Sequence, residues 1–167
     1  AGTEYFVNFN VTTVEKEPLI PIGHEIACDQ FRLPIESPKK AFKTSGPKLT
    51  VSTNGDNLSA SSSKVNFVFN RKTGIVTSYK VDGTEYFSEG FGIQPNFWRA
   101  PTDNDYGNGM PKRLQVWKES SKNFNVTDAT VTMDGNNAVV NVNYLLPAGN
   151  LYIVNYRIYP SGAVNVA

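Results

Sequence analysis

The chain has 167 residues, of which 16 are basic and 15 acidic, so its formal net charge is only +1. No basic excess exists to neutralise phosphates, which excludes nucleic acid and anionic membrane surfaces as partners. No apolar run approaches the ~20 residues that span a bilayer, and the single cysteine excludes an intramolecular disulfide. Ten Phe, eight Tyr and two Trp indicate a core of large rings, which favours strands over helices.

Residues 1–36 contain two predicted strands separated by a proline-rich loop. The first, residues 4–12, alternates as a half-buried strand does, and the second covers residues 24–33. The apolar positions of the first strand share one face: Tyr5, Val7, Phe9 and Val11. Cys28 is interpreted as a small core residue, and the lone His24 as a structural or surface histidine, because no nucleophile signature accompanies it.

Residues 37–47 are rich in proline and lysine and are interpreted as a linker. Short predicted strands follow it, separated by Asn-Gly, Asp-Gly and Pro-containing turns that are typical of hairpins. These strands cover residues 49–53, 58–61, 65–70, 75–81, 84–87, 126–133, 138–145, 151–159 and 163–166, with a further run at 91–98. Residues 111–120 are the one predicted helix, with a proline in its first turn. The alternating run at the end of the chain is expected to be truncated.

The most informative segment is residues 97–109, Phe-Trp-Arg-Ala-Pro-Thr-Asp-Asn-Asp-Tyr-Gly-Asn-Gly. An aromatic pair anchors it, a proline breaks regular structure, and the Asp-Asn-Asp run predicts a dense polar turn. Gly107 and Gly109 free the backbone to take a positive φ. Such a segment is typical of a site loop mounted on a rigid scaffold.

Two ligand interpretations of this segment have simpler alternatives. The spacing of Asp103 and Asp105 invites a calcium site, but the EF-hand pattern fails, so a turn whose carboxylates accept backbone N–H groups is favoured. Trp98, Tyr106 and Trp117 are candidates for stacking on sugar rings. Core packing is favoured for the two tryptophans, and Tyr106 is the least core-like of the three.

Periodicity therefore predicts an all-β fold, an antiparallel β-sandwich with one short helix. No pair of acidic residues carries a recognisable glycosidase signature, although such chemistry needs two carboxyl groups. Solvated surface charge is the favoured interpretation of these residues.

The Arg-Ala-Pro-x-Asp-Asn-Asp-x-Gly pattern at residues 99–107 resembles a motif in the small-chain domain of glycoside hydrolase family 2 β-galactosidases. The pattern Gly-His-Glu-Ile-Ala-x-x-Gln-Phe at residues 23–31 resembles a segment of their immunoglobulin-like domain. The resemblance implies that residues 1–36 are the terminal strands of an immunoglobulin-like domain. Residues 48–167 are then the first half of a small-chain domain, a supersandwich similar to galactose mutarotase.

The same resemblance implies a non-catalytic C-terminal portion of an enzyme that hydrolyses terminal β-D-galactosides with retention. The catalytic glutamates belong to a barrel domain outside the chain, and the fragment alone is expected to be inactive. The implied residues at the rim of the substrate cleft are Arg99, Asp103, Asn104, Asp105, Gly107, Asn108 and Gly109.

The implied partners are the barrel domain, β-galactosides and further copies of the parent enzyme. No cofactor is expected in this fragment, and Mg or Na is expected in the parent. Bacterial cytoplasm and periplasm both stay open as compartments. The alternative function is a free-standing carbohydrate-binding β-sandwich, and a third class is a structural or adhesin-type sandwich.

Overall fold

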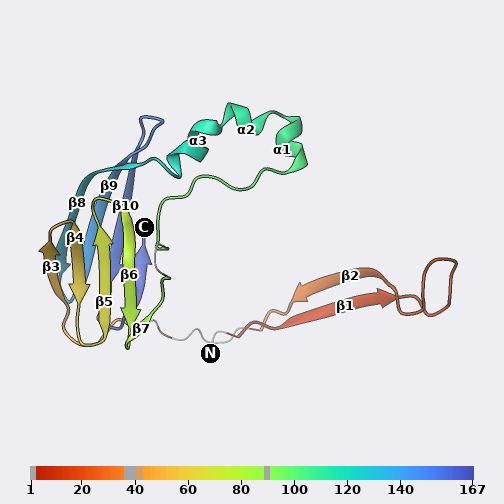
Figure 1. Cartoon of the computed structure of the whole chain (residues 1–167). Helices are drawn as coiled ribbons and strands as arrows, with labels where there is room; N and C mark the ends of the chain where they lie inside the picture. The colour runs from red at the N-terminus through yellow and green to blue at the C-terminus, as the bar shows by residue number, and fades with distance from the viewer. Residues whose placement is uncertain (1–2, 36–40, 42, 89–90) are drawn as a thin grey trace. The chain divides into compact units, whose positions relative to one another are not determined.

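A computed structural model describes residues 3–35, 41, 43–88 and 91–167. The chain divides into two compact units, Ala1–Phe42 and Lys43–Ala167. This division falls inside the predicted linker 37–47, of which residues 37–40 and 42 lie outside the described part. The first unit is a two-stranded ribbon, and the second is a β-sandwich that carries short helices (Figure 1).

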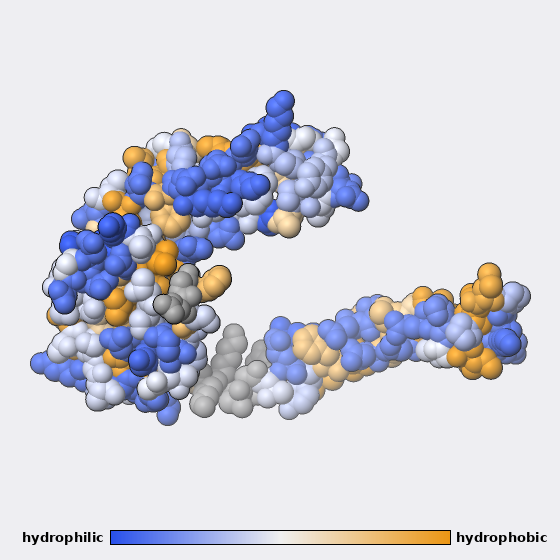
Figure 2. Space-filling view, viewed as in Figure 1, coloured by the Kyte–Doolittle hydropathy of each residue, from blue (hydrophilic) through white to orange (hydrophobic). Residues whose placement is uncertain are grey.

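The ribbon pairs β1 (Phe6–Thr12) with β2 (Glu25–Arg32) in antiparallel fashion. Val7 lies opposite Phe31, and the Phe31 ring meets the Phe9 ring edge-on at 5.8 Å, so the predicted apolar face does form. The expectation of a half-buried strand is wrong, however, because β1 is exposed at every position except Val7. A two-stranded ribbon has no second layer to cover its apolar face. Figure 2 shows apolar residues at the surface of the ribbon and at its loop end.

Cys28 is exposed, so its interpretation as a small core residue is wrong. It lies opposite Asn10 in the ladder, on the face that does not carry the Phe9–Phe31 pair. His24 is exposed in the loop before β2, as a surface histidine is expected to be, and its backbone N–H donates to the Thr13 hydroxyl at 3.0 Å.

The second unit is a sandwich of two antiparallel sheets, as the periodicity predicts. The five-stranded sheet is a meander of β3 (Thr50–Asn54), β4 (Asn57–Ser61), β5 (Val65–Asn70), β6 (Ile75–Val81) and β7 (Thr84–Glu85). The four-stranded sheet contains β8 (Asn125–Asp134), β9 (Asn137–Leu145), β10 (Leu151–Ile158) and β11 (Val164–Val166), in the order β11-β10-β9-β8. The sheets stack face to face in Figure 1.

The core lies between these two sheets and consists of rings and aliphatic side chains. Phe67 from β5 and Tyr156 from β10 are almost completely buried, with ring centroids 5.6 Å apart. Tyr144 of β9 is also buried, and its hydroxyl donates to the backbone carbonyl of Gly74 at 2.9 Å. Burial raises the pKa of the Tyr144 phenol, because the phenolate loses its hydration.

Between β7 and β8 the chain leaves the sandwich and forms three short helices. They are α1 (Asp103–Gly107), α2 (Met110–Arg113) and α3 (Gln115–Ser120). Within the described residues none of the helices is long and apolar enough to cross a membrane.

The sequence predictions for this excursion need two corrections. The single helix expected at 111–120 is interrupted at Leu114, whose φ of −110° and ψ of 19° are not helical. The expected turn at Asp103–Gly107 is instead a helical turn, because the Asp105 carboxylate accepts the backbone N–H of Thr102 and so caps its N-terminus. The run at 91–98 forms no strand; its Gly92 passes so close to the Val76 carbonyl that a Cβ at that position would lie 1.6 Å from the oxygen.

Candidate functional site

The candidate site is the segment 97–109, which supplies the end of the extended run, all of α1 and the turn into α2. Phe97 anchors it to the sandwich, because its ring packs edge-on against Tyr152 of β10 at 5.0 Å. The backbone N–H of Phe97 donates to the Ser121 hydroxyl at 2.7 Å, and that hydroxyl donates to the Trp117 carbonyl at 3.0 Å. Both ends of the excursion are thereby tied together near the sheet.

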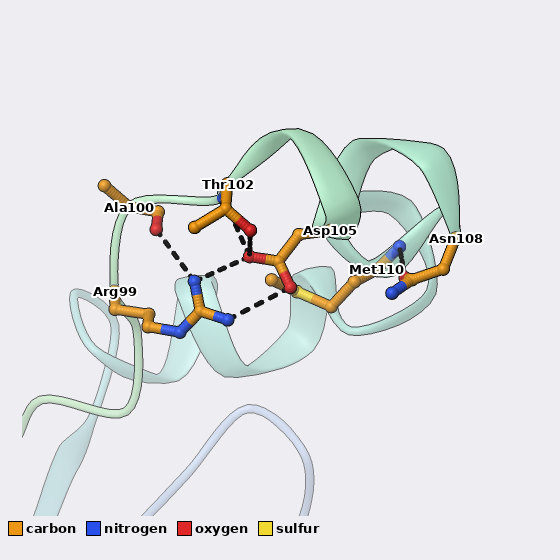
Figure 3. A network of polar contacts seen from close by, with 6 residues as sticks. All are labelled: Arg99, Ala100, Thr102, Asp105, Asn108 and Met110. Atoms are coloured by element: carbon orange, nitrogen blue, oxygen red, sulfur yellow. Dashed lines mark hydrogen bonds and ion pairs between the residues drawn. The ribbon is translucent and has the colours of Figure 1, made fainter.

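Arg99 and Asp105 form a two-pronged ion pair inside the segment (Figure 3). Arg99 Nη1 lies 2.6 Å from Asp105 Oδ2, and Nη2 lies 3.0 Å from Oδ1. Arg99 Nη1 also donates to the Ala100 carbonyl at 3.0 Å. The Asp105 side chain is 12% exposed and that of Arg99 is 63% exposed, so the carboxylate faces inward under its cation. This geometry is the bidentate pairing that arginine favours with carboxylates.

Thr102, the residue immediately before α1, completes the network. Its backbone N–H and its hydroxyl both donate to Asp105 Oδ2, at 2.8 Å and 3.0 Å. Both oxygens of Asp105 are therefore occupied, and the expected hydrogen bond from a backbone N–H to a carboxylate of this segment is confirmed for this residue. Hydrogen bonds from Arg99, followed by the Thr102 N–H, lower the pKa of Asp105 from 3.8 to about 2. The pKa of Arg99 is raised in turn by Asp105.

A pocket of about 250 Å³ lies against this ion pair. Its wall is mostly apolar and combines Phe97, Trp98, Met110, Leu114 and Trp117 with Arg99 and Asp105. The Phe97 and Trp117 rings lie 6.0 Å apart, and Trp117 packs against the sandwich core, as its core-packing interpretation expects. Trp98 is half-buried and lines this pocket.

The two motif glycines play different parts. Gly109 has a φ of +72°, so the chain turns there from α1 into α2 through the left-handed region. Gly107 is the last residue of α1 and has no positive φ, which corrects the prediction for that position. Asn108 lies between them and stabilises the turn, since its side-chain oxygen accepts the Met110 N–H at 2.9 Å.

The remaining predicted residues take no part in the network. Asp103, Asn104 and Tyr106 are exposed on α1, and none of their side chains has a hydrogen-bond partner among the described residues. The structure thus brings together Arg99 and Asp105 of the predicted set, and leaves Asp103 and Asn104 free. Sequence reasoning missed Thr102 and Ser121; the Thr-x-x-Asp spacing of a helix start could have revealed Thr102.

In the part of the chain that the structure describes, no three His, Cys, Asp or Glu side chains gather in a way that could hold a metal ion. The donor set of the segment also fits a metal poorly, because the most buried carboxylate, Asp105, already has both oxygens occupied by Arg99 and Thr102.

Comparison with known proteins adds a family match. Residues 61–167, which contain the whole helical excursion, match the family described as the β-galactosidase small chain. A β-galactosidase of Priestia megaterium is 33% identical over 146 residues, which cover 86% of this chain and 14% of that protein. A β-galactosidase of Kluyveromyces lactis is 30% identical over 130 residues, covering 75% of this chain and 12% of that protein. This chain therefore spans only a small part of the length of both relatives.

A third relative is a β-galactosidase small subunit of Latilactobacillus sakei. It is 33% identical over 69 residues, which cover 41% of this chain and 21% of that protein. The alignment with the Priestia protein is long enough to extend upstream of residue 61 and to include β2 of the ribbon. The similarity is therefore not confined to the sandwich.

Proposed function

The chain belongs to the β-galactosidase small-chain family, and on that premise we propose that it is a non-catalytic part of a larger β-galactosidase. The complete enzyme in this proposal is a glycoside hydrolase of family 2 that hydrolyses terminal β-D-galactosides with retention of configuration. The observation that carries the proposal is the family match over residues 61–167, which includes the segment 97–109.

The catalytic carboxyl groups are assigned to a barrel domain outside this chain. Retaining hydrolysis needs two carboxyl groups about 5–5.5 Å apart, one of them an acid whose pKa is raised. Asp105 has the opposite property, because Arg99 and Thr102 lower its pKa to about 2. An aspartate of this kind cannot protonate a leaving group at neutral pH, so its role in the proposal is structural.

The chain contributes the rim of the substrate cleft and a packing surface for the other domains. The Arg99–Asp105 pair and Gly109 hold the shape of the rim, and Asp103, Asn104, Gly107 and Asn108 form its outer surface. The partners are the barrel domain, β-galactosides and other copies of the complete enzyme. Any Mg or Na ion of that enzyme is assigned to residues outside this chain.

The first test uses the purified chain by itself. A chromogenic galactoside should be turned over at less than ~10⁻³ of a typical enzyme rate of ~10 s⁻¹. Calorimetric titration with lactose should give no binding tighter than about 100 μM, because one rim buries too little of a sugar. Tighter binding supports the alternative function, a free-standing carbohydrate-binding sandwich, and measurable turnover contradicts the non-catalytic assignment.

The second test asks whether the Arg99–Asp105 pair supports the rim in the complete enzyme. Arg99→Ala should lower kcat by about tenfold or more, because a misplaced rim disturbs the positioning of the substrate. Arg157→Ala is the matched control, since Arg157 forms an ion pair of the same 2.6 Å length with Asp134 but lies on β10. Thermal unfolding of both variants separates loss of fold from loss of function. Equal activities of the two variants contradict the rim assignment.

A further inference from the structure

Helix α1 has an inner and an outer face. Asp105 occupies the inner face and is held by Arg99 and Thr102. At about 3.6 residues per turn, Asp103 and Gly107 fall roughly opposite Asp105 around the helix, and Tyr106 falls about a quarter turn from it, so all three lie outside the inner face. Asp103 and Tyr106 are three positions apart, so their side chains are neighbours on the helix surface.

The outer face is free for a ligand. The Tyr106 side chain is 64% exposed, whereas Tyr144 and Tyr156 are buried in the core. Neither Asp103 nor Tyr106 has a side-chain partner among the residues that the structure describes. Beside them Gly107 contributes no side chain, and nothing lies within 4 Å of the place where its Cβ would be.

An exposed ring beside an unpaired carboxylate is a combination suited to a saccharide. The C–H face of a sugar packs on an aromatic ring, which is both apolar and polarisable. A carboxylate accepts hydrogen bonds from hydroxyl groups through two oxygens, and such charge-assisted bonds are stronger than neutral ones. The missing side chain at Gly107 leaves room for the ring of the sugar.

We propose that Tyr106 and Asp103 form a subsite for the leaving-group sugar of the substrate. The proposal rests on the proposed function, in which this segment is the rim and the catalytic carboxyl groups belong to another domain. The galactosyl unit must lie at those carboxyl groups, so the part of a disaccharide that reaches the rim is the leaving group.

The inner face makes the subsite rigid. The Arg99–Asp105 pair and the two bonds from Thr102 fix α1 from beneath. The backbone that carries Tyr106 therefore does not need to be ordered when the sugar arrives, which lowers the entropic cost of binding. Arg99 and Asp105 are positioning residues in this arrangement, and Asp103 and Tyr106 touch the ligand.

The test compares two substrates of the complete enzyme, lactose and methyl β-D-galactoside, whose leaving group is too small to reach the rim. Tyr106→Ala should raise KM for lactose by about tenfold and leave kcat unchanged, because the lost contact is made equally before and during the reaction. Its KM for the methyl galactoside should not change. Tyr106→Phe should keep most of the affinity for lactose, and Asp103→Asn should raise its KM by about threefold to tenfold.

Tyr86→Ala is the matched control, since Tyr86 is 62% exposed and lies outside the segment. An unchanged KM for lactose in Tyr106→Ala, or an equal rise for both substrates, overturns the subsite. Arg99→Ala tests the rim separately from the subsite. If it lowers kcat while Tyr106→Ala has no effect, the subsite is wrong and the rim stands; if neither variant has an effect, the proposed function is wrong as well.

Discussion

At the scale of single residues, the motif contains side chains that hydrogen-bond within the segment and side chains that are exposed. Asp105 looks like Asp103 in the sequence, yet one is buried under Arg99 and the other is exposed. Gly107 and Gly109 also look alike, yet only Gly109 takes a positive φ. Each of these differences leads to a measurable prediction.

Gly109→Ala should destabilise the chain, and Gly107→Ala should not. An L-residue at a φ of +72° is strained by about 1 kcal/mol, whereas alanine at a helical position is favoured over glycine by about 0.5 kcal/mol. Gly107 also has open space around the new methyl group. Urea unfolding of both variants measures the difference, and an equal loss of stability in the two contradicts the assigned backbone conformations.

The Asp105 ion pair should make stability depend on pH in the acid range. The folded-state pKa of Asp105 is about 2, below its ordinary value of 3.8, so unfolding takes up a proton between these values. The stabilisation is complete above pH ~4 and is lost as pH falls toward about 2. In urea titrations, the difference between wild type and Asp105→Asn should shrink over this window. A difference that stays constant across it means that the carboxylate is not held by Arg99.

At the scale of elements, the sandwich is stabilised by buried rings and by the few polar bonds between them. Phe67 of β5 and Tyr156 of β10 join the two sheets through ring contact. Tyr144 of β9 joins the four-stranded sheet to the turn before β6, because its hydroxyl reaches the Gly74 carbonyl. Helix α1, by contrast, is stabilised from within its own segment by Asp105.

Tyr144→Phe should lower the free energy of unfolding by about 1–2 kcal/mol, because the buried Gly74 carbonyl loses its hydrogen-bond donor. Tyr106→Phe is the control and should change stability little, since the Tyr106 hydroxyl has no partner among the described residues. Chemical denaturation of the two variants at neutral pH provides the measurement. A loss in Tyr144→Phe no larger than in Tyr106→Phe shows that the buried bond does not contribute.

At the scale of the whole molecule, the two units differ in how well each covers its own apolar surface. The sandwich of residues 43–167 buries a continuous core between two sheets. The ribbon of residues 6–32 exposes Phe9 and Phe31 on one face. An uncovered face of this kind promotes association.

The isolated chain should therefore self-associate through the ribbon. Replacing Phe9 and Phe31 together by Ser should abolish the association, which sedimentation velocity at increasing concentration detects. Phe6→Ser is the control, because Phe6 is also exposed but lies opposite Arg32 on the other face. A wild-type chain that stays monomeric at its highest soluble concentration contradicts this prediction.

Local pattern was sufficient to predict most of the strands, although the run at 91–98 forms none. Strands β5 and β6 begin and end at the predicted residues, because alternation with a period of two and flanking turn residues define both ends. The sandwich class follows from the same pattern and is confirmed. The resemblance of the 99–107 motif to the β-galactosidase small chain is confirmed by the match over residues 61–167, and the assignment of residues 1–36 to an immunoglobulin-like domain stays a prediction.

The tertiary structure decided which motif residues meet. Alternation and turn propensity contain no information on whether Asp103 or Asp105 turns inward; that depends on the position of Arg99 and on the capping of α1 by Asp105. The sequence also did not determine whether Cys28 is buried or exposed, since one face of a strand is buried only if a second layer covers it. Sequence determined most strands of this protein because their signals are local. Tertiary structure decided the exposure of the ribbon strands, because the layer that would cover a strand comes from residues distant in the chain.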